Sequence, residues 1–161
     1  MLGVLGGVKL VKLMDKEYMS LALLEAKKAA LAGEVPVGAV IVNKAGEILA
    51  SAYNQKELYA DATCHAEILA IKKAAAAIGN WCLADCTIYA TLEPCPMCAG
   101  AILNARLKRL VYATDDIKAG GVYSVFNILT HARLNHKVQV TVGVGEEESR
   151  ELLRDFFSKK R

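Results

Sequence analysis

The sequence predicts an α/β protein with a three-layer α/β/α architecture around a mixed five-stranded sheet. Short apolar runs of strand length alternate along the chain with longer runs of helix length, and this alternation is typical of a sheet between two helical layers. The turn "KAGE" joins the first two strand-like runs into a hairpin, which makes the sheet mixed rather than wholly parallel. The 161 residues contain no repeat, linker or low-complexity tract, which indicates one principal domain.

The N-terminal half is expected to contain a helix, a hairpin and a second helix. Apolar side chains recur at helical spacing over residues 15–32, with charged side chains on the other face. The run "VPVGAVIV" (35–42) is typical of a buried strand, and "ILASAYN" (48–54) of the returning strand. The alanine-rich residues 66–77 predict the next helix, and Thr63 is expected to cap it.

The C-terminal half is expected to alternate strands and helices. The three strands expected here are "CTIYATL", "LKRLVYAT" and "KVQVTVGV" (86–92, 107–114 and 137–144). Proline suits the first helical turn, so Pro96 is expected to begin a helix that runs to Arg106. Residues 123–131 also look helical, and the last helix is expected over 146–159, where acidic residues come first and basic residues last.

Residues 1–13 are interpreted as an N-terminal extension ahead of a domain at residues 14–161. The segment is apolar, but it lacks the leading positive charges and the small-residue cleavage site of a secretory signal. It is also too short to span a bilayer. Met14 is therefore expected to begin the domain, and it is a candidate for the natural start of translation.

Composition and charge narrow the functional class. With 54% hydrophobic and 23% charged residues, the chain is globular rather than disordered. A net charge of +3 is too small to indicate a nucleic-acid-binding protein by itself. The C-terminal Lys159, Lys160 and Arg161 can either end a solvated helix or contact a nucleic-acid backbone. Five cysteines, an odd number, argue against a disulfide framework and favour a cytoplasmic protein with reduced thiols.

Metal-ligating residues occur in two stretches, "TCHAE" and "EPCPMC". Cys95 and Cys98 begin a helix, where free N–H groups favour thiolates, and their spacing places both sulfurs on one side. A structural zinc site needs two more protein ligands, but the sequence has no second CxxC. His65 is the best third ligand. Three protein ligands leave one position for water, and zinc lowers the pKa of that water toward ~7.

Glu67 is expected to be the catalytic proton carrier rather than a fourth ligand. Taken singly, each residue has an ordinary explanation: a histidine can cap a helix, a CxxC pair can be redox-active, and a glutamate is normally solvated. The ordered set, H-x-E followed by P-C-x-x-C, is the signature of zinc nucleobase deaminases. Cys82 and Cys86 are expected to be small buried hydrophobic residues.

From about Met14 to Arg161 the sequence resembles the bacterial tRNA-specific adenosine deaminase family, in the cytidine deaminase-like superfamily of zinc deaminases. The stretches that carry the resemblance are "GEVPVGAVIV", "HAEILAI", "GNW", "TLEPCPMCAGAI", "LNHKV" and "LLRDFF". The resemblance implies a cytidine deaminase-like fold and hydrolytic conversion of adenosine to inosine at the wobble position of a tRNA anticodon stem-loop. It also implies a homodimer with one Zn²⁺ per subunit, bound by His65, Cys95 and Cys98, with Glu67 as proton shuttle.

The resemblance also implies five substrate contacts. Asn54 would hydrogen-bond the flipped base, Val37 would pack against it, and the backbone N–H of Ala66 would face the same cavity. Asp116 would contact the sugar, and Lys118 in the same loop is a candidate phosphate contact. Two of these residues have structural alternatives, because Asn54 can simply shape the turn after its strand and Asp116 can cap its own loop.

The sequence departs from the family at four positions: Ala62, Cys64, Cys82 and Ile117. Cys64, beside the zinc histidine, can either compete for the metal or pack as a small hydrophobic residue. Two other functions stay open. One is a free-base or nucleoside deaminase, acting on guanine or cytosine with the same zinc chemistry. The other is a non-catalytic zinc-binding RNA module, for which Glu67 would have no purpose.

Overall fold

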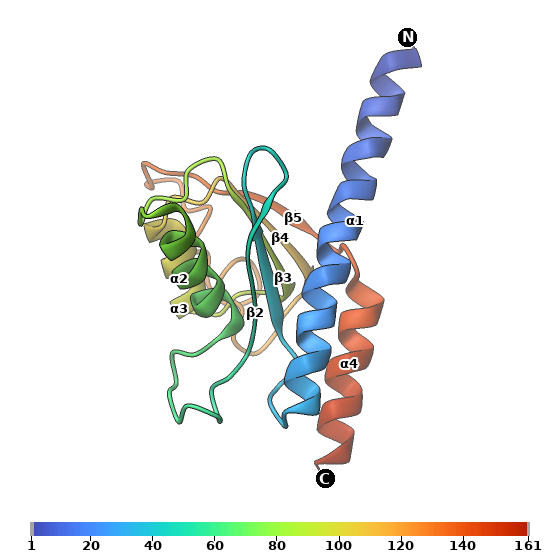
Figure 1. Cartoon of the computed structure of the whole chain (residues 1–161), viewed down its shortest axis with the longest axis vertical. Helices are drawn as coiled ribbons and strands as arrows, with labels where there is room; N and C mark the ends of the chain where they lie inside the picture. The colour runs from blue at the N-terminus through green and yellow to red at the C-terminus, as the bar shows by residue number, and fades with distance from the viewer. Residues whose placement is uncertain (1, 161) are drawn as a thin grey trace.

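A computed structural model describes the backbone of residues 2–160 and the side chains of residues 14–160. The helices are α1 (Leu2–Leu31), α2 (Ala66–Ile78), α3 (Pro96–Asn104) and α4 (Glu146–Lys159) (Figure 1). The strands are β1 (Gly38–Val42), β2 (Ile48–Tyr53), β3 (Thr87–Leu92), β4 (Arg109–Thr114) and β5 (Gln139–Val142). In the described part of the chain, none of the helices has the length and hydropathy that crossing a membrane requires.

All five strands belong to one sheet in the order β2-β1-β3-β4-β5. β1 is antiparallel to both of its neighbours, β2 and β3, whereas β3, β4 and β5 are parallel to one another. The predicted hairpin is the β1–β2 pair, and it makes the sheet mixed, as expected. Because β1 alone runs against the other strands, its first residues lie at the same edge of the sheet as the last residues of β3.

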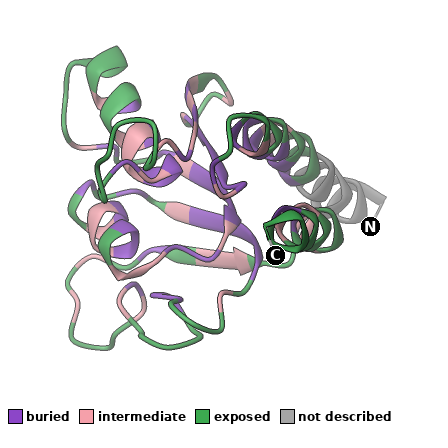
Figure 2. Cartoon of the chain, turned by 90° about the horizontal axis from the view of Figure 1, so that it is seen from below, coloured by how far each residue is buried: buried purple, intermediate pink, exposed green. Residues whose placement is uncertain are grey.

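The sheet separates two helical layers, which confirms the three-layer α/β/α prediction (Figure 1). α2 and α3 cover one face, and α1 and α4 cover the other. Successive strand residues point to opposite faces, so Ile41 packs in the core beneath α2 and α3 while Val40 packs in the core beneath α1. Buried residues are concentrated where the helices meet the sheet (Figure 2).

A polar anchor joins α1 to the sheet. The guanidinium of Arg109 donates two hydrogen bonds to the carboxylate of Asp15, at 2.8 and 2.7 Å. The hydroxyl of Tyr89 donates a third at 2.9 Å. Burial, followed by the bond to Asp15, raises the pKa of the Tyr89 hydroxyl well above its usual range, so the tyrosine stays a donor. These bonds fix α1, at Asp15, to β3 and β4.

The structure corrects one predicted element. Residues 123–131 form turns rather than a helix. The backbone N–H groups of Tyr123 and Ser124 donate to the carboxylate of Glu93, at 2.8 and 2.9 Å, and those of Val125 and Phe126 donate to the carbonyl of Gly120. Both acceptors lie outside residues 123–131 and take the donors that a helix would pair within itself, so no helix forms.

Several boundaries also differ. α1 begins at Leu2 rather than near residue 15; the structure describes only the backbone of residues 2–13 of the predicted extension, and Met1 lies outside the described residues. Thr63 does not cap α2, because its hydroxyl donates to Asp61 and the N-cap position belongs to His65. The last helix begins and ends as predicted, at residues 146 and 159.

Candidate active site

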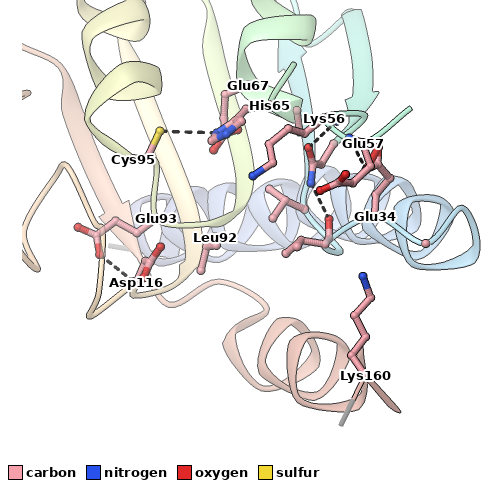
Figure 3. Close-up of a pocket in the computed structure, with 15 residues that line it drawn as sticks. Glu34, Lys56, Glu57, His65, Glu67, Leu92, Glu93, Cys95, Asp116 and Lys160 are labelled. Carbon is pink, nitrogen blue, oxygen red and sulfur yellow. Dashed lines mark hydrogen bonds between the residues drawn. The ribbon is translucent and has the colours of Figure 1, made fainter. Parts of the chain in front are cut away.

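A cavity of about 210 Å³ opens at the edge of the sheet where β3 ends and where α2 begins (Figure 3). Its walls come from the segment that precedes β1, from the segment that follows β2, and from the first residues of α2. The segments that follow β3 and β4 complete them. A cavity at the carboxyl end of a central strand is a common location for substrate sites in α/β proteins. His65, Glu67 and Cys95, which the sequence analysis gives as site residues, all line this cavity.

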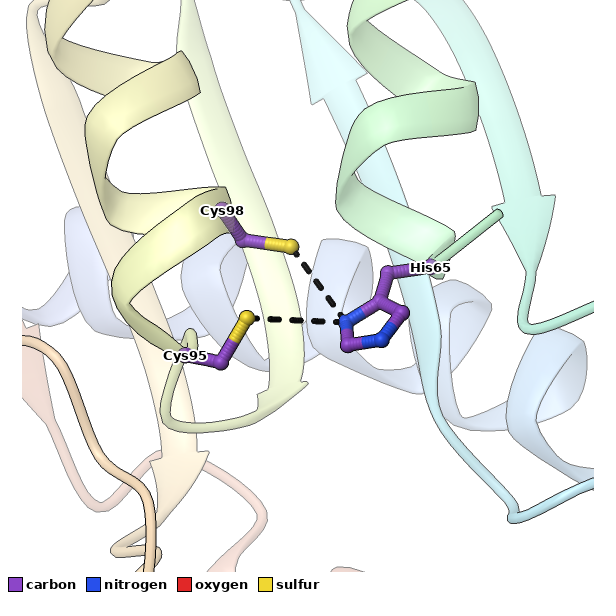
Figure 4. A group of neighbouring side chains, drawn as sticks. All are labelled: His65, Cys95 and Cys98. Atoms are coloured by element: carbon purple, nitrogen blue, oxygen red, sulfur yellow. Dashed lines mark hydrogen bonds between the residues drawn. The ribbon is translucent and has the colours of Figure 1, made fainter. Parts of the chain in front are cut away.

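His65, Cys95 and Cys98 come together beside the cavity (Figure 4). The Nδ1 atom of His65 lies 3.6 Å from the Sγ atom of Cys95 and 3.6 Å from that of Cys98. All three candidate ligand atoms lie within 4.8 Å of one another. In a tetrahedral zinc site the usual bond lengths separate a nitrogen from a sulfur ligand by about 3.6 Å, so this donor set fits one zinc ion.

Helix starts position all three of these side chains. His65 is the N-cap residue of α2 and Cys95 is that of α3, and both have extended backbone conformations. Neither side chain makes a capping hydrogen bond at the start of its own helix, and the imidazole and the thiol face each other instead. Pro96 occupies the first turn of α3, as the sequence predicts, and Cys98 follows within that turn, fully buried.

Proton affinities in the cluster favour binding of a cation. The hydrogen bond from Cys98, followed by the bond to His65, lowers the pKa of the Cys95 thiol to about 4. The same contact with Cys95, together with burial, raises the pKa of Cys98. A metal cation bound between the two sulfurs would hold both as thiolates.

Glu67 lies on the first turn of α2, immediately beside the cluster. Its side chain is buried at 3% exposure, lines the cavity, and accepts a hydrogen bond from the Sγ atom of Cys98 at 3.6 Å. Burial raises the pKa of its carboxyl group. In the described part of the chain, the residues grouped closely enough to share a metal ion are His65, Cys95 and Cys98, without Glu67. The carboxyl group is thus adjacent to the ligand set rather than part of it.

Four of the five predicted substrate residues line the cavity: Val37, Asn54, Ala66 and Asp116. Lys118 does not. It is exposed, and its backbone N–H donates to the carboxylate of Asp116 at 3.1 Å. Lys118 is therefore exposed and does not belong to the cavity wall that Asp116 helps to form.

The structural alternatives for Asn54 and Asp116 also hold. The amide of Asn54 donates to the carbonyl of Val35 at 3.2 Å and accepts from the backbone of Lys56 at 3.2 Å, so it shapes the turn after β2. One oxygen of Asp116 accepts from the backbone of Lys118 and of Ala119. Each side chain keeps further hydrogen-bonding capacity for a ligand. A local structural role and a substrate contact are therefore compatible at both positions.

Cys64 stands apart from the metal cluster. It is buried at 8% exposure, and its thiol is hydrogen-bonded to Asp61. Burial raises the pKa of this thiol. It lies outside the group of three ligands found among the described residues. Cys64 therefore packs as a small residue against the loop that precedes His65 and is not among the candidate metal ligands.

Sequence reasoning missed several residues that line the cavity, among them Glu34, Lys56 and Glu93 (Figure 3). Glu34 is buried, and its carboxylate accepts from the backbone of Glu57 at 2.7 Å. Lys56 extends its ammonium group toward the cavity, as does Lys160 from the end of α4. Lys160 belongs to the basic C-terminus that the sequence analysis gives as a candidate nucleic-acid contact. The position of Glu93 just before Pro94 is the one local signal that points to that residue.

Comparison with known proteins gives the family. The sequence profile of the MafB19-like deaminases matches residues 14–161. The chain is 49% identical over 149 residues to the tRNA-specific adenosine deaminase of Aquifex aeolicus (strain VF5), which covers 92% of this chain and 97% of that protein. It is 46% identical over 147 residues to the tRNA-specific adenosine deaminase of Bacillus subtilis (strain 168), which covers 91% of each.

Solved structures agree with this assignment. A structure from a study of A-to-I editing by tRNA:A34 deaminases at the wobble position of transfer RNA has a TM-score of 0.81 and 42% identity, over 85% of this chain and 99% of that chain. The guanine deaminase of Bacillus subtilis has a TM-score of 0.59 and 42% identity, over 62% of this chain and 63% of that chain. The chain therefore belongs to the MafB19-like deaminase family and, within it, to the bacterial tRNA-specific adenosine deaminases.

Proposed function

We propose that this protein converts adenosine to inosine at the wobble position of a tRNA anticodon by hydrolysis, with one Zn²⁺ held by His65, Cys95 and Cys98. The observation that carries the proposal is the buried carboxyl group of Glu67 beside a three-ligand metal cluster, both bordering the same cavity. A purely structural zinc site would have four protein ligands and would not need a carboxyl group next to them.

The proposed chemistry assigns proton transfer to Glu67. A zinc ion bound by the three ligands would supply a water molecule whose pKa is lowered toward neutrality. Glu67 takes a proton from the attacking water and delivers it to N1 of the adenine ring. A C–O bond forms at C6, and the bond between C6 and the amino nitrogen breaks. Glu67 passes the second proton to the departing amino group, which leaves as ammonia, and the base is then hypoxanthine.

The cavity walls would hold the base and its ribose. Val37 offers an apolar surface for one face of the ring, and Asn54 and the backbone N–H of Ala66 offer hydrogen bonds to its edge. Asp116 has a carboxylate oxygen that the loop does not use, and this oxygen can accept a bond from a ribose 2′-hydroxyl. A wobble base is already unpaired in its loop, so extruding it costs less than extrusion from a duplex.

Basic side chains at the cavity mouth support a phosphate-bearing substrate. Lys56 and Lys160 both line the cavity and approach it from different elements, the loop after β2 and the end of α4. Ammonium groups in these positions can pair with phosphates on either side of an extruded nucleotide. Lys118 lies farther out on its loop, where it can contact phosphate of the same RNA.

The proposal includes a homodimer in the cytoplasm. Exposed apolar side chains outside the helices and strands, among them Leu58, Tyr59 and Phe126, offer apolar surface that a second copy can cover. All five cysteines are free, which agrees with the reducing compartment where tRNA is found. Light scattering of the purified full chain measures the mass, and a monomer at micromolar concentration would contradict the dimer.

The decisive experiment is incubation of the zinc-loaded protein with an anticodon stem-loop that carries adenosine at the wobble position. Deamination replaces an amino group with an oxygen, and mass spectrometry should detect a gain of about 1 Da at that nucleotide alone. The same stem-loop with guanosine at the wobble position is the control.

A specific observation favours one rival, because a guanine deaminase is 42% identical over 62% of this chain. Release of ammonia from free guanine, with no change in the RNA, would establish that rival. A bound but unaltered RNA would instead indicate a non-catalytic RNA module.

A further inference from the structure

We propose that Glu93 is a positioning residue, which fixes the loop of residues 115–124 to the turn that carries Cys95 and thereby sets where Asp116 stands in the cavity. Glu93 follows the last residue of β3 and precedes the Pro94–Cys95 pair. It is buried at 1% exposure and lines the cavity. The kinetic part of this inference rests on the proposed function, because it takes Asp116 as a substrate contact.

The carboxylate of Glu93 collects donors from both ends of this loop. One oxygen accepts from the backbone N–H of Asp116, at the near end, at 2.9 Å, and from the hydroxyl of Ser124, at the far end. At the far end, the other oxygen accepts from the backbone N–H groups of Val122, Tyr123 and Ser124 at 3.2, 2.8 and 2.9 Å. A single side chain therefore closes the loop on itself.

Two glycines show how closely the loop lies against residues 93–95. A Cβ atom on Gly120 would lie 2.3 Å from the carboxyl carbon of Glu93, and one on Gly121 would lie 2.8 Å from the backbone carbon of Cys95. The backbone N–H of Gly121 also donates to the carbonyl of Pro94 at 2.7 Å. No side chain fits between the loop and the metal-binding turn, so a movement of one is passed directly to the other.

The hydrogen-bond pattern requires a carboxylate and not just any polar group. In Glu93→Gln the side chain keeps its size but has one acceptor oxygen and one NH₂ group. Whichever way the amide turns, the NH₂ faces N–H donors at one end of the loop. That end must be released, either at Asp116 or at residues 122–124. A released loop must be ordered again when substrate binds, which weakens binding more than it slows the chemical step.

Hydrogen–deuterium exchange of the zinc-loaded full chain tests the placement without reference to activity. Glu93→Gln should accelerate exchange by about tenfold or more at the released end of the loop, either at Asp116 or at residues 122–124, with the metal content unchanged. Asp15→Asn is the matched control: it also replaces a buried carboxylate with an amide, but on α1, where the carboxylate bonds to Arg109 and not to the loop of residues 115–124. It should lower the melting temperature and leave exchange in the loop as it is in the native protein.

The kinetic readout separates a positioning role from a merely structural one. With a wobble-adenosine stem-loop, Glu93→Gln should raise KM by about tenfold and change kcat by less than about threefold. In an Asp116→Ala background the same substitution should have little further effect on KM, because the residue that Glu93 positions is already absent. Equal effects of Glu93→Gln in both backgrounds would overturn the proposal.

Each failure has a distinct signature. If the native protein does not act on the RNA, the proposed function fails, while loop exchange still decides whether Glu93 holds the loop. If Glu93→Gln does not fold, Ser124→Ala takes its place, since it removes the hydroxyl donor and should accelerate exchange at Asp116 and Ser124 by a smaller factor. Unchanged loop exchange in a folded Glu93→Gln or in Ser124→Ala overturns the positioning role.

Discussion

His65 and Cys95 occupy N-cap positions without capping their helices. A side-chain cap at a helix start contributes about 0.5–2 kcal/mol, and α2 and α3 both forgo it. The free N–H groups at both helix starts instead provide a partly positive environment around the sulfurs and the cavity. His65 and Cys95 therefore do not contribute the stability of a helix cap, and their side chains face the cluster instead.

Cys95→Ser should lose the bound metal together with the activity, because a hydroxyl is a much poorer zinc ligand than a thiolate. Metal analysis of the purified variant measures the loss. Cys64→Ala is the matched control, since Cys64 adjoins His65 in sequence but bonds to Asp61 instead of joining the cluster. It should retain one zinc per chain. A full complement of metal in Cys95→Ser would contradict ligation by that residue.

Glu67→Ala should retain the metal and lose activity. Removal of a general acid–base typically costs a factor of about 10²–10⁴ in rate, and a group that carries two protons belongs at the upper end of that range. Single-turnover kinetics on the stem-loop, with metal content measured on the same sample, provides the check. Residual activity within about tenfold of the native protein would rule out the proton-shuttle role.

Motif spacing reveals some site residues and misses others for a physical reason. His65, Glu67, Cys95 and Cys98 are predicted from spacing because the metal ligation and proton transfer that we propose for them restrict both residue type and separation. Glu93 has no such restriction, since its partners are backbone N–H groups whose location depends on the whole fold. Its role therefore becomes visible only once the loop of residues 115–124 is in place.

At the scale of elements, local signals are sufficient where an element's hydrogen bonds are internal. α4 begins and ends as predicted because its amphipathic face and its terminal charges are all encoded within the segment. Residues 123–131 fail this condition, because Glu93 and the carbonyl of Gly120 supply acceptors from outside the segment. The β1 strand is shorter than predicted for a similar reason: the backbone of Val35 serves Val37 and Asn54 instead of a neighbouring strand.

The anchor between α1 and the sheet provides a stability prediction. Arg109→Ala leaves the nearly buried carboxylate of Asp15 without its cationic partner, and we expect a loss of about 2–3 kcal/mol in the free energy of unfolding. The melting temperature should fall by roughly 5–10 °C. Urea unfolding followed by circular dichroism measures the loss of free energy, and a thermal scan measures the fall in melting temperature.

The control for this prediction is Lys27→Ala. Lys27 pairs with Glu148 across α1 and α4, but both side chains are about half exposed, at 47% and 49%. Exposed pairs contribute little, so the change should stay below about 1 kcal/mol. Equal losses in the Arg109 and Lys27 variants would show that burial of the first pair does not matter.

At the scale of the whole molecule, the side-chain contacts described for α1 belong to its residues from 14 onward. Asp15, Met19 and Leu23 anchor the helix to the sheet and to its second core. The family profile also matches from residue 14 onward. We propose that residues 14–161 fold and function as the deaminase domain without residues 1–13.

Deletion of residues 1–13, with translation starting at Met14, should leave the melting temperature within about 3 °C and kcat/KM within about threefold of the full chain. Thermal unfolding and stem-loop kinetics, measured side by side on both proteins, provide the comparison. A deletion variant that aggregates or loses most of its activity would show that the extension is part of the working domain.

Cys95 and Cys98 follow His65 in the chain by 30 and 33 residues. They meet His65 only because β3 and its neighbours set α2 beside α3. An unfolded chain has no comparable site, so a bound ion stabilises only the native state. Under the proposed role, a nascent chain cannot capture its metal until the sheet has assembled. In a metal-starved cell the protein would then lose resistance to proteolysis along with catalysis, so metal supply would control its abundance as well as its activity.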